Sequence, residues 1–507
     1  MNQTTDPQQN AGTGGRVGPI GLRIPEPDRP AALQELTAGL SEILSAAPER
    51  AVPELAELLA AANRQRLDPE TRGDWLEQLR PEVQRLVDVQ EQSAPGIPAC
   101  SPFDATARLL AALSDGCKLV AEELAARPKA APLPLAAALQ RSLTTLGWRL
   151  LHCFRHYSQP PADLWREIHL LFRFATRNGL ESVLVADPLA PVSPCRLEQC
   201  YSRLLLLSLA NPFSLPQATL AELERRTWSW AEMVRISAGP DGASRFQVDL
   251  DQDAPPLPRE TGGGSGPERR LVDTSALLEE LVTVLGRPAE PSAKGLSGTL
   301  VRHLIQVWGE PSSAAARRHP RTDRTVAVEL VLGIEALHAL LTPRGSVLVR
   351  PPPSHSCRTL DTSLSGYRLA WESPAADLQP GQPVGLGLPQ GNERRWLVGV
   401  VRWIQRQAGQ SGFTLGVQLL AAHGESASVR MTDDGETVTR CLVLPALPAI
   451  GLQRTLLLPG GDFRPGSELL LETGDSREHI RLQELASASD SYSQYHFLSS
   501  GVREFTL

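Results

Sequence analysis

The chain has 507 residues and a formal net charge of −7, with 41% hydrophobic and 21% charged residues. This length predicts about three domains, and the composition is that of an ordinary globular protein, which excludes wholesale disorder. The acidic balance argues against a protein built mainly to bind a nucleic-acid polymer. No stretch of about 18 apolar residues occurs, so no membrane-spanning helix is predicted.

The N-terminal residues 1–27 are polar and contain glycine and proline throughout. They lack the apolar segment of a secretory signal, so we expect a disordered tail. The cysteines are odd in number and scattered, which predicts reduced thiols and a cytoplasmic location, not a disulfide framework. They are Cys100, Cys117, Cys153, Cys195, Cys200, Cys357 and Cys441.

Residues 28–250 are rich in alanine and leucine and show helical periodicity. Leu55, Leu58, Leu59 and Ala62, for example, have the i, i+3, i+4, i+7 spacing of one helix face. We therefore predict an all-α domain and leave its topology open, because no repeat of a helical solenoid is found. The predicted helices are 29–46, 51–64, 70–92, 104–127, 134–157, 161–178, 196–209 and 216–236.

A change in composition marks the end of this domain. Residues 251–271 contain Pro255-Pro256 and the glycine-rich run 262–266, which predict a flexible linker. Two helices, 272–287 and 297–309, are expected in the helical connector that follows, 272–316.

From about residue 325 the apolar residues alternate, which is typical of β-strands. Turn residues separate the strands over 317–424, as in a small antiparallel barrel. Residues 425–507 are also rich in β-strand patterns and are expected to pack beside it, with a second small barrel as one arrangement. The predicted fold class is therefore a multidomain α + β protein. Its predicted strands are 366–372, 383–388, 396–405, 413–420, 437–444, 454–458, 468–472, 480–484 and 495–499.

Two short motifs in the β-rich half carry candidate chemistry. Residues 317–321, Arg-Arg-His-Pro-Arg, have the form RxxxR, and residues 361–366, Asp-Thr-Ser-Leu-Ser-Gly, have the form DxSxxG. Arginine binds phosphate oxygens and the O6/N7 edge of guanine in a bidentate manner. Asp361 can accept from guanine N–H groups or orient an arginine, and Ser363 can donate to a phosphate or a base edge. Gly366 permits a close backbone approach or an unusual turn.

RxxxR followed by DxSxxG at the start of a small β-barrel resembles the PilZ domain, the bacterial receptor for cyclic di-GMP. The segments 396–403, ending in Val-Arg-Trp, and 412–419, beginning with Gly-Phe, are similar to later strands of that family. The resemblance covers 317–424. It implies that Arg317 and Arg321 grip guanine edges and phosphates and that Arg318 adds a phosphate contact. It also implies that Asp361 and Ser363 complete the guanine contacts and that Gly366 holds the turn.

The spacing of the two motifs departs from the family. Arg321 and Asp361 are 40 residues apart, and the extra length falls in 333–358, which contains a helix-like stretch, 334–341. This insertion is either harmless, or it shields or reshapes the site. Residues 317–424 hold 12 arginines against 7 acidic residues, a local charge of +5 in an acidic chain, which suits an anionic ligand.

Other signals are interpreted as structural. His152, His156 and His169 invite comparison with a zinc site, but no HExxH arrangement is present, so we expect satisfied core histidines and no metal. Cys195 and Cys200 have no second pair to complete a zinc site. Residues 459–463, Pro-Gly-Gly-Asp-Phe, lack the second acidic residue of a GGDEF cyclase motif and are predicted to form a turn. No cofactor and no enzymatic activity are predicted.

The aromatic stretch 148–174 is expected to be the core of the helical domain, with a partner-binding groove as the alternative.

Long helical regions joined to a PilZ domain resemble effector proteins of bacterial surface motility, type IV pili or exopolysaccharide. The predicted function is a cyclic di-GMP effector whose helical domain docks a protein partner. Two alternatives remain: a scaffold with a degenerate PilZ barrel, and a metal-dependent hydrolase using the three histidines. The oligomeric state stays open.

Overall fold

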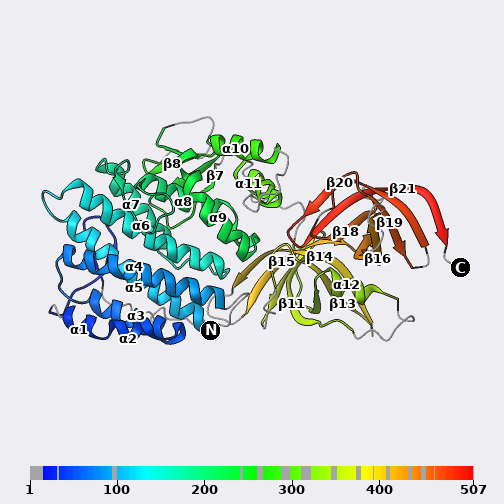
Figure 1. Ribbon diagram of the computed structural model, residues 1–507, viewed down its shortest axis with the longest axis horizontal. Coiled ribbons are helices and arrows are strands. Elements are labelled where there is room, and N and C mark those ends of the chain that lie inside the picture. Colours follow the sequence, from blue (N-terminus) through cyan, green and yellow to red (C-terminus); the bar gives the residue numbers. More distant parts are fainter. Residues whose placement is uncertain are drawn as a thin grey trace, which may run out of the picture. The chain divides into compact units, whose positions relative to one another are not determined.

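The structure is a computed structural model in which the chain divides into two compact units (Figure 1). The first unit comprises Met1–His156, Pro160–Ala210 and Leu223–Glu280, and the second comprises Tyr157–Gln159, Asn211–Glu222 and Leu281–Leu507. The residues that it describes are 15–30, 33–93, 100–239, 244–259, 266–286, 297–309, 321–343, 351–372, 378–391, 393–406, 412–431, 437–446, 453–461, 463–474 and 476–505.

The predicted helices of the N-terminal half are confirmed, with shifts of their ends. The largest shift is in the last of them, whose predicted end is residue 236 but which ends at Trp230, before a strand that begins at Arg235. The first one is two short helices, α1 and α2, separated at Gly39. Leu55 and Leu59 of α3 are fully buried, as the periodicity requires, and α3 packs against α5. The helices are α1 (Leu33–Ala38), α2 (Leu40–Ser45), α3 (Pro48–Asn63), α4 (Pro69–Ser93), α5 (Cys100–Ala125), α6 (Pro132–Arg155), α7 (Leu164–Arg177), α8 (Leu197–Leu209) and α9 (Gln217–Trp230).

Part of the expected N-terminal tail is ordered, so the prediction of disorder is wrong there. Strands β1 (Gly15–Val17) and β2 (Arg23–Pro25) pair antiparallel. Leu22 is fully buried, and the Glu122 carboxylate of α5 accepts the backbone N–H groups of Ile20 at 2.8 Å and Leu22 at 2.7 Å. A buried acceptor outside the segment satisfies its amides, and that pairing has no local sequence signature. Residues 1–14 lie outside the described part.

The helical unit is also not purely α-helical. A two-stranded sheet joins β3 (Leu184–Val185) and β4 (Cys195–Arg196). A four-stranded sheet has the order β5-β8-β6-β7, formed by β5 (Arg235–Ser237), β6 (Phe246–Asp249), β7 (Leu257–Pro258) and β8 (Arg269–Asp273). Strands β7 and β8 fall largely within the expected linker, which is therefore partly a sheet. Val248 of β6 and Val272 of β8 are buried in this sheet. Both strands are too short for apolar and polar residues to show a clear alternation in the sequence.

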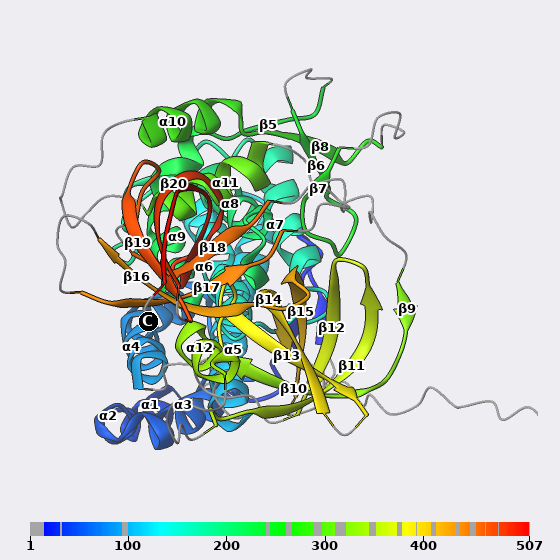
Figure 2. The same ribbon diagram turned by 90° about the vertical axis from the view of Figure 1, so that its right-hand side faces the viewer.

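Two further helices, α10 (Ser275–Gly286) and α11 (Gly298–Gly309), confirm the predicted helical pair. After them comes a six-stranded antiparallel barrel with the order β10-β13-β14-β15-β12-β11, closed by pairing of β10 with β11 (Figure 2). The short strand β9 (Thr322–Asp323) adds to β11. The barrel strands are β10 (Ala327–Leu332), β11 (His355–Ser363), β12 (Gly366–Trp371), β13 (Pro383–Gln390), β14 (Glu393–Arg406) and β15 (Phe413–Ala421).

The C-terminal segment is a second closed six-stranded barrel with the order β16-β17-β18-β21-β20-β19, which confirms that arrangement. Its interior holds alternate residues of every strand, such as Val429, Leu456 and Leu482. Its strands are β16 (Glu425–Met431), β17 (Thr439–Leu444), β18 (Thr455–Pro459), β19 (Glu468–Thr473), β20 (Ser476–Ala488) and β21 (Tyr492–Phe505).

Helix α12 (Ile334–Leu341), the predicted helix of the inserted stretch, joins the two barrels. It contacts β10 and β13 of the first barrel and β16 and β17 of the second. Leu337 of α12 shares a core with Val400 of β14 and Leu442 of β17. Because Cys441 and Val443 face the barrel interior while Leu442 faces α12, β17 is apolar on both sides.

Within the described part of the chain, no helix has both the length and the apolar character that crossing a membrane requires.

Candidate functional site

The DxSxxG motif forms the end of the β11–β12 hairpin. Ser363 pairs with Gly366, which leaves Leu364 and Ser365 as the two loop residues. The Ser363 hydroxyl donates to the Gly366 carbonyl at 3.3 Å. Asp361 and Ser363 lie two residues apart on β11, and alternation places both side chains on one face of the sheet.

The first motif reaches this hairpin through β9. Thr322 and Asp323, directly after Arg321, pair with Thr362 and Asp361 of β11. A strand pairing therefore brings Arg321 beside Asp361 although 40 residues separate them in the sequence. The inserted helix α12 makes its main contacts with β10, β13, β16 and β17, so the insertion bridges barrels.

Asp361 organises two arginines. Its Oδ1 accepts a hydrogen bond from Arg321 Nη1 at 2.8 Å, and its Oδ2 forms an ion pair with Arg368 Nε at 2.8 Å. The Asp361 side chain is 7% exposed, whereas Arg321 is 39% and Arg368 is 43% exposed. One buried carboxylate thus holds two guanidiniums that still face solvent, which leaves a net positive surface suited to an anion.

Arg368 was not among the predicted site residues. Its register explains its position, because it lies directly opposite Asp361 in the β11–β12 pair. Opposite charges facing each other across two strands are a recognisable signal once the hairpin register is known. The register itself depends on the loop length, which the DxSxxG spacing alone does not state.

Gly366 is required by strand packing. A Cβ at this position would lie 2.3 Å from the carbonyl oxygen of Val417 on the neighbouring strand β15. No side chain fits at that distance, so the glycine lets β12 and β15 approach. A close approach between strands is thus a reason for Gly366 that the sequence did not show. Its φ is not positive, so no unusual turn requires glycine, and an approach to ligand stays a prediction.

The row of paired residues continues across the barrel. Arg368 pairs with Gly416 of β15, which pairs with Trp403 of β14, so all four positions from Asp361 to Trp403 share one face. A Cβ on Gly416 would lie 2.1 Å from Trp403 Nε1, so the indole lies over the glycine toward the arginines. Trp403 is half-buried and offers an aromatic surface beside the cations. From the sequence, Trp403 was predicted only as part of a strand segment similar to the family, and not as a site residue.

Four of the six predicted site residues, Arg321, Asp361, Ser363 and Gly366, therefore gather around one hairpin end. Arg317 and Arg318 lie outside the described residues, so their place in the site stays a prediction.

The three histidines considered as a zinc site do not converge. His169 is fully buried, with Nδ1 accepting from the Tyr201 hydroxyl and Nε2 donating to the Ala254 carbonyl, both at 2.9 Å. Burial lowers the pKa of His169 to about 4. His152 and His156 lie instead at the end of α6, beside Glu91 of α4. The combination of all three histidines is therefore wrong, and His169 is a satisfied core histidine.

Comparison with known proteins gives three family matches in chain order. Residues 32–241 match the family model of the cyclic-di-GMP receptor FimW, N-terminal domain. Residues 346–425 match that of the FimW middle PilZ domain, and 426–499 that of the FimW C-terminal β-barrel domain. The chain is also 24% identical over 580 aligned positions to the cyclic-di-GMP receptor FimW of Pseudomonas aeruginosa, with 95% of this chain and 94% of that protein covered.

The PilZ match begins at residue 346, so it includes Asp361, Ser363 and Gly366 but not Arg321. The barrel is nevertheless larger than the matched range, because β9 and β10 pair into the same sheet. The order of a helical domain, a six-stranded barrel and a second barrel agrees with the order of the three matches. The C-terminal half of this chain therefore contains a PilZ domain, and the domains on either side of it match those of FimW.

Proposed function

We propose that the chain is a cyclic di-GMP-binding effector, with its ligand held on the outer face of the first barrel. Arg317, Arg318 and Arg321 would bind guanine edges and phosphates, and the hairpin of Asp361, Ser363 and Gly366 would complete the site. The observation that carries the proposal is the buried Asp361 carboxylate, which holds Arg321 and Arg368 side by side with their outer edges exposed. The matches to the FimW models support the same ligand.

The geometry gives these residues different roles: Asp361 orients the arginines, and the arginines contact the ligand. Both Asp361 oxygens contact arginines, so this carboxylate orients the cations and leaves recognition of the guanine O6/N7 edge and the phosphates to them. A guanidinium has five N–H donors, and Arg321 gives one to Asp361. The Ser363 hydroxyl can rotate from the Gly366 carbonyl toward a phosphate. Strand β15 lies between Arg368 and Trp403, so at about 4.8 Å per strand their backbones are roughly 10 Å apart. The Trp403 indole lies over Gly416 of β15, within reach of a purine held by Arg368.

The coupling proposal concerns the segment that ends in Arg321. Residues 317–320 lie outside the described residues; we propose that phosphates bind the guanidiniums of 317–321 and hold this segment against β11, and that the effect reaches the helices that precede it in the chain, 272–309. The helical half would serve as the output domain that docks a protein partner. By analogy of domain order, we propose that the effector acts in the cytoplasm on surface motility, type IV pili or exopolysaccharide.

Calorimetric titration of the full chain with cyclic di-GMP tests the ligand. We expect binding that Arg321→Ala weakens at least about tenfold, because a charge-assisted hydrogen bond contributes roughly 1.5–3 kcal/mol. The double variant Arg317→Ala/Arg321→Ala should abolish it, and GTP should not compete.

Arg394→Ala is the matched control. Arg394 is also 39% exposed on the first barrel and paired with one carboxylate, that of Glu329 at 2.6 Å, but it lies near the β13–β14 turn. Its loss should leave the affinity unchanged. No binding by the unaltered chain, or an equal loss in Arg321→Ala and Arg394→Ala, would contradict the proposed site and favour a scaffold with a degenerate barrel.

A further inference from the structure

The C-terminal ends of α4 and α6 bring together three side chains that can hold a metal ion. Glu91 lies in the last turn of α4, and His152 and His156 lie one turn apart at the end of α6. Each offers one ligand atom, and these atoms all lie within 4.8 Å of one another. Two histidines at i, i+4 face the same side of a helix, which is a common way to present a pair of imidazoles to one ion.

The hydrogen bond that His152 makes fixes its tautomer. Its Nε2 lies 3.2 Å from the backbone carbonyl oxygen of Phe103, and a carbonyl only accepts, so Nε2 carries the proton. In the neutral ring, Nδ1 then has a free lone pair. Nδ1 is buried and has no hydrogen-bond partner among the described residues. A ring oriented by a backbone carbonyl, with its other nitrogen free, is the usual state of a metal-binding histidine.

A second unpaired acceptor faces this nitrogen. The Glu91 Oε2 accepts from Arg155, while Oε1 is buried without a hydrogen-bond partner in the described part of the chain. His152 Nδ1 and Glu91 Oε1 are 3.7 Å apart, too far for a hydrogen bond. Tetrahedral zinc with bonds of about 2.0–2.1 Å places its ligand atoms roughly 3.3–3.5 Å apart, close to this separation.

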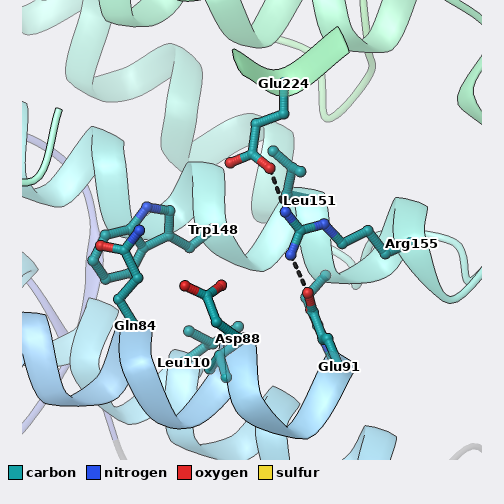
Figure 3. A pocket seen from close by; sticks show the side chains of 10 residues that line it. Gln84, Asp88, Glu91, Leu110, Trp148, Leu151, Arg155 and Glu224 are labelled. Carbon is teal, nitrogen blue, oxygen red and sulfur yellow. Dashed lines mark hydrogen bonds and ion pairs between the residues drawn. The ribbon is translucent and has the colours of Figure 1, made fainter. Parts of the chain in front are cut away.

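An aromatic ring and several carboxylates surround the group. The ring of Phe103 stacks on His152 with centroids 4.8 Å apart and meets His156 edge-on at 5.2 Å. A cavity of about 40 Å³ adjoins the group and is lined by Asp88, Glu91 and Glu224 around Arg155 (Figure 3). Burial, with the neighbouring carboxylates Glu91 and Glu224, raises the pKa of Asp88 against the opposing effect of Arg155.

We propose that Glu91, His152 and His156 form a site for a divalent transition-metal ion, with zinc as the ion that fits a His₂–carboxylate set. Arg155 would keep holding Glu91 Oε2 while Oε1 binds the ion. The cavity has room for a bound water, which needs about 10–15 Å³. The ion would tie the end of α4 to the end of α6 and so brace the helical unit.

The test measures metal on untagged full-length protein. The protein is stripped with a chelator, dialysed against Zn²⁺, and its zinc content is determined by mass spectrometry. Co²⁺ is then added as a spectroscopic probe. We expect one equivalent of zinc, and cobalt absorption of a nitrogen–oxygen site without thiolate charge-transfer bands. Glu91→Gln and His152→Gln should each weaken binding at least about tenfold.

His479→Gln is the control, because His479 is an exposed histidine of β20 and should bind zinc as the unaltered chain does. Glu91→Gln keeps the shape of the side chain, and its circular dichroism should match that of the unaltered chain. Zinc should also raise the melting temperature of the unaltered chain and not that of Glu91→Gln. The proposal is overturned if the unaltered chain takes up no zinc, if Glu91→Gln binds it equally well, or if cobalt shows thiolate bands. In the first case, Glu91, His152 and His156 would be core side chains that hold no ion.

Discussion

Gly366 shows how a single atom can decide the geometry of the proposed ligand site. Nothing in its backbone conformation demands glycine, since its φ is not among the positive values in the described chain. The demand comes from β15, whose Val417 carbonyl occupies the place of a side chain. The same strand pairing sets the distance between Arg368 and Trp403, so the glycine acts on the site through sheet register.

We therefore expect Gly366→Ala to lower the free energy of unfolding of the barrels by about 1–3 kcal/mol, the usual cost of forcing an atom into a packed position. It should also weaken cyclic di-GMP binding, because the β11–β12 hairpin must shift. Urea denaturation and calorimetry measure the two effects. Gly286→Ala, where an added Cβ meets nothing within 4 Å, should stay within about 0.5 kcal/mol. Equal stability of the two variants would show that β15 yields without cost.

His169 gives a prediction for the pH dependence of stability. Burial lowers its pKa from 6.5 to about 4, and the Tyr201 hydroxyl donates to the nitrogen that would take the proton. The unfolded chain therefore binds this proton first as the pH falls. The contribution of His169 is complete above pH 6.5, is lost as the pH falls toward about 4 and is constant below it. The loss amounts to roughly 3 kcal/mol.

Urea denaturation of the full chain at pH 7 and pH 4.5 measures this effect on the stability of the helical unit. His169→Gln should lose less stability than the unaltered chain between the two pH values, because glutamine does not titrate. His479→Gln, at an exposed position, should follow the unaltered chain. If all three proteins lose the same stability, another group carries the pH dependence.

At the scale of elements, helix α12 turns an insertion into a connection. Leu337 is fully buried, and Gly385 of β13 makes room for it, since a Cβ there would lie 2.6 Å from Leu337 Cδ2. On the other side, Leu442 of β17 and Leu457 of β18 face the same core, and Glu335 pairs with Arg440 of β17 at 2.8 Å. The two barrels thus share apolar surface that neither could bury alone.

Leu337→Ala should destabilise both barrels by about 2–5 kcal/mol, because it leaves a cavity in that shared core. Hydrogen exchange followed by mass spectrometry would show faster exchange in peptides of β13 and of β17 together. Leu498→Ala, at a β21 position that is 61% exposed, should change neither. Faster exchange in one barrel alone would mean that the barrels open independently.

At the scale of the whole molecule, the two units carry different chemistry. The described part of the proposed ligand site lies in the second unit, and the proposed metal site lies in the first. Residues 317–424 carry a local charge of +5 in a chain of −7, so the excess of arginine falls in the sequence range of the first barrel, as the proposed anionic ligand requires. In an effector, ligand binding to one unit must change the state of the other unit. The ligand can do so only if it binds the two states of the protein with different free energies.

Cyclic di-GMP should therefore slow hydrogen exchange around Arg321 and Asp361 and also change it in α10 or α11, outside 317–424. The comparison is made with and without ligand, and the double variant Arg317→Ala/Arg321→Ala, in which binding should be abolished, serves as the control that should show no ligand effect. Tight binding with changes confined to 317–424 would contradict the coupling, although not the binding.

Much of this protein could be predicted from its sequence. Helix periods of 3.6 and strand periods of 2 are local, so elements such as α3 and β15 appear in the sequence close to their observed ends. The DxSxxG motif is local, because it lies within one hairpin. Together with RxxxR and the segments 396–403 and 412–419, it carried the resemblance that implied the PilZ barrel.

Only the tertiary structure decided what depends on contacts between distant segments. The segment of β1 and β2 is held in place by the Glu122 carboxylate, 100 residues from Leu22 in the sequence. The need for glycine at position 366 comes from the Val417 carbonyl on another strand. Arg368, Trp403 and the meeting of Glu91 with His152 likewise follow from strand register and helix packing. Periodicity states which face of an element is buried, but the partner of that face is set by packing across the whole chain.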